Sequence, residues 1–222
     1  MNQRFRYQKR GFTLTELLVV IGIIAILGFL AFPIGRMAIL HAQCTGCASH
    51  MRTLGMAFMS FATDNNGQLP GRVEGDGNNK WPILLQPYVP DLSVYVDPGD
   101  PVAMKIPQDQ FLSNGSNNSS FFFNGFNDLG AYNNPNITVG LVNLTDASNL
   151  ILLGQKVHGI TQYYMDFVEG NQNDILNKTA YFGGSNYVFA DGSARFLYKS
   201  QYSDTMWLIN QNYSIPPVPA GH

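Results

Sequence analysis

Residues 9–27 read KRGFTLTELLVVIGIIAIL, and this stretch decides the architecture of the chain. Two basic residues and a glycine open it, and an apolar run without any charge follows from Leu17 to Gly35. The run of 18 apolar residues that ends at Ile34, together with residues 13–15, reaches the roughly 20 residues that a helix needs to span a bilayer. The sequence therefore predicts a membrane-spanning helix near the N-terminus.

The residues before this helix carry a strong positive charge. No acidic residue lies among the four basic ones, which are Arg4, Arg6, Lys9 and Arg10. The positive-inside rule then predicts a cytoplasmic N-terminus, with everything after Arg36 across the membrane. Without residues 1–11 the chain loses four of its 13 basic residues and none of its 15 acidic ones, so its formal net charge falls from −2 to −6. We expect no nucleic-acid partner, because such a partner needs a basic surface.

An ordinary secretory signal peptide is the simpler explanation of a basic start and an apolar run. Its apolar region is usually about 7–15 residues long, which is shorter than the run found here. Glu16 also lies at the entrance of the run, four residues after Phe12. A carboxylate inside a membrane costs about 2.5–3.5 kcal/mol on insertion scales, so its presence indicates a function.

The stretch KRGFTLTELLVVIGIIAIL resembles the prepilin-type signal of type IV pilins and type II secretion pseudopilins. The resemblance implies that a prepilin peptidase/methyltransferase cleaves the chain between Gly11 and Phe12 and methylates the new amino group of Phe12. It also implies that Glu16 guides the assembly of subunits and that Pro33 kinks the helix. A proline removes one helical hydrogen bond and clashes with the preceding turn, which agrees with a kink there.

After Pro33 the apolar residues become periodic, at alternating steps of three and four. The stripe consists of Met37, Leu40, Cys44, Cys47, Met51, Leu54, Phe58 and Phe61. This spacing predicts a helix with one buried face, and residues 65–67 (Asn-Asn-Gly) predict its end. A helix from about Thr13 to Ala62 would be about 75 Å long at 1.5 Å per residue.

His41, Cys44, Cys47 and His50 follow one another at steps of three, which raises the question of a metal site. Three such steps spread the four side chains over about half of the helix circumference, so they cannot converge on one ion within one helix. Because both cysteines lie on the apolar stripe, we expect them to pack as small hydrophobic residues. A local disulfide and a metal shared between subunits are the alternatives.

Beyond Thr63 the sequence predicts one β-rich domain with many turns. Apolar or aromatic runs bounded by turn residues predict strands at 92–96, 120–126, 149–153, 187–190 and 194–198. Asp191-Gly192 predicts a tight hairpin between the last two strands. We also expect short helices at 81–89 and 203–210, and long surface loops at 98–118 and 127–147.

The expected fold class is α+β, with a long N-terminal helix whose second half packs against an antiparallel sheet. The expected parts are a basic leader (1–11), a transmembrane and assembly helix (12–35) and an exported head (36–222).

Several head segments are similar to a pseudopilin-like family with an H-X9-DG motif near its C-terminus. They read CASHMRTLGMAFMSFATDNNGQLP, WPILLQPYV, DPGDP and GGSNYVFADGSARFL. Two departures stand out. Tyr181 occupies the position of the histidine, ten residues before Asp191, and Asp97 occupies the position of a common cysteine.

No catalytic motif is found, so we expect neither an enzyme nor a cofactor. Four acidic residues late in the chain raise the alternative of a calcium site: Asp166, Glu169, Asp174 and Asp191. Their spacing matches no defined calcium loop, so solvated carboxylates are the expected interpretation. The aromatic run 121–123 is expected to be strand core, with a ligand platform as the alternative.

The leading functional hypothesis is a structural subunit of a type II secretion pseudopilus or a type IV pilus-like filament. Its expected partners are further copies, other pseudopilins, the processing enzyme and the assembly machinery of the inner membrane. The subunit would cross that membrane once, with its N-terminus in the cytoplasm and its head outside, until it enters the filament. The alternative is a minor pilin or membrane-tethered module that binds an extracellular surface or glycan.

Overall fold

The computed structural model describes residues 12–72, 80–107, 118–131, 137–167, 172–210 and 212–215. The chain divides into two compact units, Met1–His41 and Ala42–His222, and we call the second one the head unit. The predicted boundary between residues 35 and 36 stays a prediction.

One long helix, α1 (Leu14–Asp64), begins in the first unit and ends in the head unit. It agrees with the predicted helix to within two residues at each end. The helix continues through residue 33, so the proline does not interrupt it. At the other end, Asn66 and Gly67 have positive φ angles of 56° and 78°, and the Gly67 amide donates to the Ala62 carbonyl over 2.7 Å. This turn stops α1 as the Asn-Asn-Gly sequence predicts.

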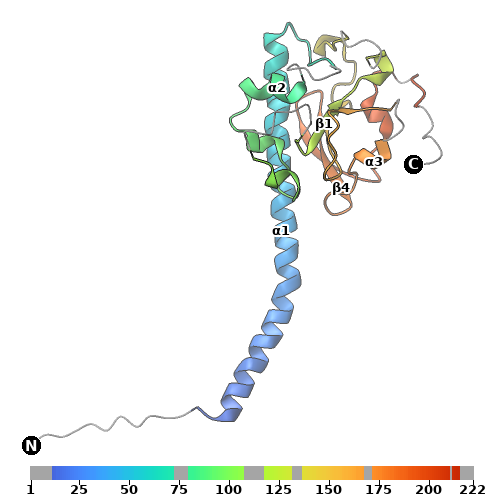
Figure 1. Ribbon diagram of the computed structural model, residues 1–222. Coiled ribbons are helices and arrows are strands. Elements are labelled where there is room, and N and C mark those ends of the chain that lie inside the picture. Colours follow the sequence, from blue (N-terminus) through green and yellow to red (C-terminus); the bar gives the residue numbers. More distant parts are fainter. Residues whose placement is uncertain are drawn as a thin grey trace, which may run out of the picture. The chain divides into compact units, whose positions relative to one another are not determined.

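The head unit contains a five-stranded sheet in the order β3-β1-β2-β4-β5. Figure 1 labels two of its strands, β1 and β4. The strands are β1 (Phe121–Asn124), β2 (Ile151–Gln155), β3 (Tyr164–Met165), β4 (Gly184–Phe189) and β5 (Ala194–Tyr198). All neighbouring pairs are antiparallel except β1 and β3, which are parallel. The α+β prediction is therefore confirmed, with a mostly antiparallel sheet.

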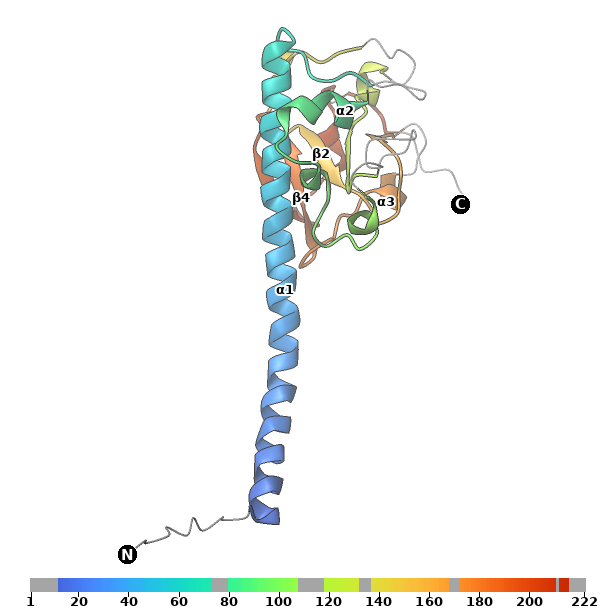
Figure 2. The ribbon, with the colours of Figure 1, turned by 60° about the vertical axis from the view of Figure 1, so that its left-hand side comes forward.

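The part of α1 within the head unit lies along the sheet, beside β2 and β4 (Figure 2). Cys47, Met51, Leu54 and Phe58 are fully buried there, as the apolar stripe predicts. The Phe58 ring stacks on Phe123 of β1 at 4.8 Å between centroids.

The first two stripe residues, Met37 and Leu40, are 52% and 40% exposed, so the prediction was wrong to include them. They belong to the first unit, and the buried face begins at Cys44 and Cys47.

The short elements agree less well with the sequence predictions. The segment 81–89 forms α2 (Trp81–Leu85) and a 3-10 turn (Gln86–Tyr88), as expected. The strand predicted at 92–96 is wrong, because Leu92–Tyr95 is a 3-10 helix whose first turn is capped by the Asp91 side chain. The helix predicted at 203–210 is only a 3-10 turn, Asp204–Trp207.

Two elements were not predicted, β3 and the helix α3 (Gln172–Ile175). The predicted loops at 98–118 and 127–147 contain 3-10 turns at Ala103–Lys105, Asn127–Leu129 and Leu141–Asn143 within the described residues.

Candidate functional site

The first turn of α1 holds Glu16 in reciprocal hydrogen bonds with Thr13. The Thr13 amide and hydroxyl donate to Glu16 Oε2 over 2.9 and 2.8 Å, and the Glu16 amide donates to Thr13 Oγ1 over 3.3 Å. In this capping box, two side chains satisfy amides that the first helical turn leaves without partners. The Thr-x-x-Glu spacing is the sequence signal for this role, which apolar periodicity does not reveal.

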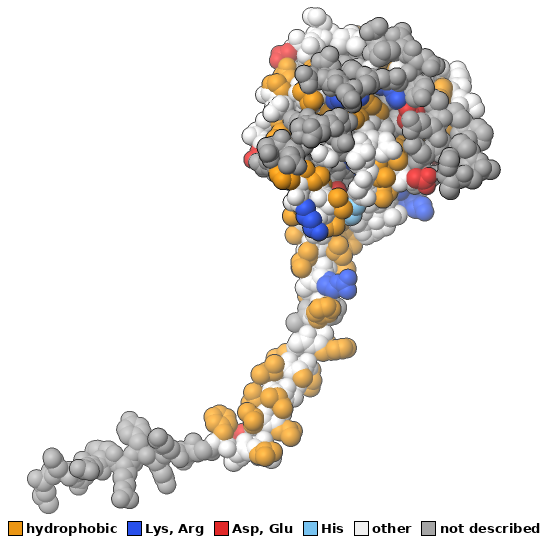
Figure 3. Space-filling view, viewed as in Figure 1, with side chains coloured by type: hydrophobic (Ala, Val, Ile, Leu, Met, Phe, Trp, Pro, Cys, Tyr) orange, Lys and Arg blue, Asp and Glu red, His pale blue; other side chains and the backbone are white. Residues whose placement is uncertain are grey.

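The helix that follows the capping box exposes an almost continuous apolar surface. Hydrophobic side chains gather along the first part of α1 (Figure 3). Leu18, Ile24 and Leu27 are 60%, 62% and 60% exposed. Among the described residues, α1 is the one helix long and apolar enough to cross a membrane, with a mean hydropathy of 2.9 over 18 residues. Apolar surface of this extent is typical of a segment that lipid or other subunits cover.

The predicted site residues fall near this surface. Phe12 precedes the helix and is 84% exposed, and the Glu16 carboxylate is one helical turn further on. Gly11 lies outside the described residues. Residue 33 is helical, and the kink predicted for Pro33 stays a prediction.

Comparison with known proteins agrees with this geometry. Residues 6–32 match the prokaryotic N-terminal methylation motif. The match covers the predicted cleavage site, Glu16 and most of the apolar run, and so includes the first part of the long helix α1. A head that contains a sheet follows the helix. The chain fits a type IV pilin-like precursor. No curated protein and no solved structure matches the chain.

The prepilin-type motif supports methylation, processing by a prepilin peptidase and anchoring in a membrane by α1. The motif does not extend to the head, so the family resemblance there stays a prediction.

A buried polar network in the head unit joins the two positions at which the sequence departs from that resembled family. The Tyr181 hydroxyl donates to Asp97 Oδ1, and both residues are buried. The Gly99 amide also donates to Asp97 Oδ1 over 2.9 Å, and Gln155 Nε2 donates to Asp97 Oδ2 over 2.6 Å. Burial and the hydrogen bond to Asp97 raise the pKa of Tyr181, so its hydroxyl stays protonated.

The same network reaches α1. Gln155 Oε1 accepts from the Asn186 amide over 2.7 Å, and Asn186 Nδ2 donates to the Cys44 carbonyl over 3.3 Å. Asn186 thereby connects β4 with the helix, since Gln155 and Asn186 belong to neighbouring strands. The network therefore fixes the helix against the sheet, and a structural role accounts for its geometry.

The cysteines occupy the interface between α1 and the sheet. Both thiols are free: Cys47 is fully buried in the core, and Cys44 is partly buried. Burial raises the pKa of both thiols, with a further contribution from the negative charge of Asp97. The nearby His50 ring nitrogen Nδ1 lies 2.7 Å from the Val96 carbonyl oxygen, which holds the ring beside the 3-10 helix.

The four acidic residues considered for calcium have different surroundings. Asp166 is buried in an ion pair with Arg72 at 2.7 Å and accepts from Asn127 Nδ2 at 2.6 Å. Asp191 accepts hydrogen bonds from the Ser193 amide and hydroxyl, and Asp174 is exposed. Glu169 lies outside the described residues. Within the described part of the chain, no cluster of three or more His, Cys, Asp or Glu side chains could hold a metal ion.

Lys156 was not singled out by its sequence. Its backbone continues the pairing between β2 and β1 beyond the ends of the two strands, because its amide donates to the Ser120 carbonyl over 2.9 Å. The side chain is 97% buried and lines a pocket of about 100 Å³ together with Asp100. Burial lowers the pKa of Lys156 to about 7. The position of a lysine directly after a strand does not reveal in the sequence that its side chain is buried.

Proposed function

We infer that the chain is a structural subunit of a type II secretion pseudopilus or a type IV pilus-like filament. The observation that carries this proposal is the methylation motif on a long helix whose first part exposes apolar side chains. Such a surface is stable in lipid before assembly and against the helices of other subunits afterwards. The proposal assigns the chain no catalytic reaction.

In this proposal the subunit starts as a single-pass protein of the inner membrane, with its leader in the cytoplasm and its head outside. A prepilin peptidase/methyltransferase removes residues 1–11 and methylates the amino group of Phe12. Inner-membrane assembly machinery then moves the subunit into a filament of further copies and other pseudopilins. The basic leader and the apolar helix support this orientation by the positive-inside rule.

The test combines mass spectrometry with immunogold microscopy of sheared surface filaments. We expect a mature chain that begins at methylated Phe12 and gold label along the whole length of filaments. A mature terminus near residue 31 would indicate an ordinary signal peptidase instead. Label only at filament tips, or only on membranes, would favour a minor pilin or a tethered binding module.

A further inference from the structure

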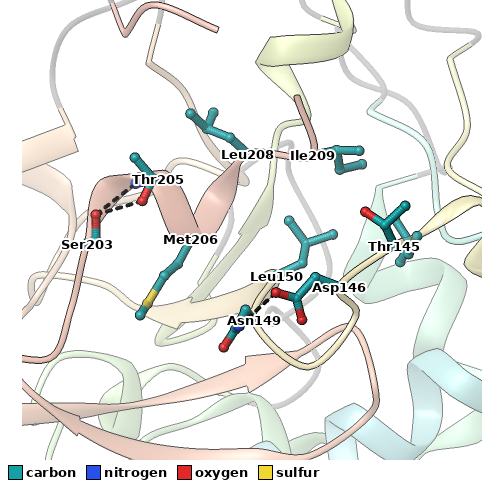
Figure 4. A pocket seen from close by; sticks show the side chains of 10 residues that line it. Thr145, Asp146, Asn149, Leu150, Ser203, Thr205, Met206, Leu208 and Ile209 are labelled. Carbon is teal, nitrogen blue, oxygen red and sulfur yellow. Dashed lines mark hydrogen bonds between the residues drawn. The ribbon is translucent and has the colours of Figure 1, made fainter. Parts of the chain in front are cut away.

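A pocket in the head unit is lined by both aliphatic and polar side chains (Figure 4). It has a volume of about 460 Å³. Leu150 and Leu208 are buried in its floor, and Met206 lines it beside them. The rim includes the exposed carboxylate of Asp146 and the amide of Asn149. No cation is among the lining residues that the structure describes, so the pocket suits a ligand with an aliphatic stem and a positive end.

The Asp146 carboxylate keeps acceptor capacity for such a ligand. Its two oxygens accept from the Ser148 hydroxyl over 3.1 Å and from Asn149 Nδ2 over 2.7 Å. An ionised carboxylate offers about four acceptor positions, so both oxygens can take a further donor. Arg195 is a cation near this turn, and its guanidinium interacts with other groups. It lies 3.5 Å from the centroid of the Phe189 ring and donates to the Ser148 carbonyl.

This pocket lies at one end of the sheet. The Ala190 amide donates to the Leu150 carbonyl over 2.8 Å, and the Asp191 amide donates to the Ala147 carbonyl over 3.1 Å. These bonds place the turn that carries Asp146 where β4 ends. Two further exposed acids lie toward this end, Asp191 in the hairpin and Asp64 at the end of α1.

Lys199 lies at the opposite end of the sheet. It follows β5, and its amide donates over 3.0 Å to the carbonyl of Gly183, just before β4 begins. Its side chain is exposed and takes part in no ion pair among the described residues, whereas the neighbouring cation Lys178 pairs with Asp204 at 3.1 Å. The six residues of β4 separate Lys199 from the Asp146 rim of the pocket by about 20 Å at 3.3 Å per residue.

Strand β4 runs in the same direction as α1. Near its start, Asn186 Nδ2 donates to the Cys44 carbonyl; near its end, a side chain at Gly55 would meet Val188 Cγ1 at 3.1 Å. The acidic pocket and the free lysine are therefore offset along the helix axis. A second copy that lies beside the first and is displaced by about 20 Å along that axis would bring its Lys199 level with the Asp146 rim of the first.

We propose that Lys199 of one copy of this chain occupies the pocket beside Asp146 of the next copy. The four methylenes of the lysine would cover the aliphatic floor, and its ammonium group would meet the Asp146 carboxylate at the rim. Donor and acceptor lie at opposite ends of the head, so the contact is heterologous and repeats without closing, as a filament requires. The inference rests on the proposed function and names the surfaces through which the heads meet.

Carbodiimide treatment of wild-type filaments tests this contact directly, because it joins a lysine amine to a carboxylate only where the two touch. We expect a ladder of covalent multimers and a peptide in which Lys199 is linked to Asp146. The two residues of one copy are about 20 Å apart, so this link must join different copies. Lys199→Arg is the matched control: it keeps the charge and the filaments but cannot form the amide, so the linked peptide should disappear.

Charge reversal gives a second measurement. Lys199→Asp and Asp146→Lys should each lower the amount of filament by about tenfold, and the double variant should restore it. Asp174→Lys, at an exposed acid outside the pocket, should leave the amount unchanged. Filaments that form normally but give no such link, or a double variant that is no better than the single ones, would overturn the contact and leave the proposed function intact. A wild-type chain that forms no filaments would overturn both.

Discussion

At the scale of single residues, the Tyr181 hydroxyl makes a buried hydrogen bond whose loss is measurable. Tyr181→Phe removes one donor to the Asp97 carboxylate and leaves the Gly99 amide and Gln155 in place. Hydrogen bonds to charged groups contribute about 1.5–3 kcal/mol, so the free energy of unfolding should fall by about that amount. Urea unfolding of the full chain in detergent measures it. Tyr198→Phe is the control, because the Tyr198 ring is 53% exposed, and its effect should stay within about 0.5 kcal/mol. Equal losses in both variants would contradict the role of the network.

The lowered pKa of the buried Lys156 predicts how the free energy of unfolding depends on pH. Its pKa is about 7 in the folded chain and 10.5 in its reference state, so the unfolded chain binds more protons between these values. Stability should therefore rise as the pH increases from 7 toward 10, by at most about 1.4 kcal/mol per pH unit. Lys156→Met should remove this rise, and the difference between the two unfolding curves isolates the lysine from the tyrosines. Parallel pH profiles for the two proteins would show that the amine is not desolvated.

At the scale of elements, the hairpin between β4 and β5 depends on Gly192. Its φ angle is 80°, and a Cβ there would lie 2.8 Å from Met59 Cγ on α1. Gly192→Val should lower the free energy of unfolding by about 1–3 kcal/mol through backbone strain, with an additional loss from this contact. Gly159→Val is the control: its φ is 83° but nothing lies within 4 Å of the added Cβ, so it reports the strain alone. Asp191→Asn should be mild, because the amide oxygen can still accept from Ser193.

The elements that could be predicted from the sequence are those with local signals. The α1 stripe follows the helical period, and Asp191-Gly192 supplies the residue that the hairpin needs at positive φ. The apolar run 92–96 misled the prediction, since a short apolar run fits a strand or a helical turn equally well. Only the Asp91 cap distinguishes the two, and its effect is local to one turn.

Other features depend on contacts between distant segments and have no local signal. Strand β3 has two residues and exists because it pairs in parallel with β1. The hydrogen bond between Tyr181 and Asp97 joins residues 84 positions apart. In the sequence, each residue therefore looks like an isolated departure from the resembled family. Glu16 could be singled out from the sequence because the motif that contains it is contiguous. The role of Thr13 depends on side-chain hydrogen bonds to Glu16, which apolar periodicity does not reveal.

At the scale of the whole molecule, the proposed assembly role of Glu16 and its capping of α1 can be separated by substitutions. In the single chain its carboxylate accepts from Thr13 and caps α1. In the proposed filament it pairs with the amino group that cleavage creates at Phe12 of an adjacent subunit. That amine has a reference pKa of about 7.7–8.0 and is largely protonated at neutral pH, and methylation keeps its charge. Such a pair would set the register between neighbouring subunits, because a misplaced subunit leaves both charges unpaired in an apolar environment.

Glu16→Gln keeps an oxygen that can accept from Thr13 but removes the charge, whereas Thr13→Val removes the hydroxyl and keeps the charge. In cells without the wild-type copy, we expect both variants to be inserted and cleaved, as measured by the mass of the mature chain. Thr13→Val should assemble with a modest loss, since a cap contributes about 1 kcal/mol. Glu16→Gln and Glu16→Val should both fail to enter filaments, because neither can neutralise the Phe12 amine of a neighbour. If Glu16→Gln assembles as well as the wild type while Thr13→Val does not, the capping box and not the charge would set the register.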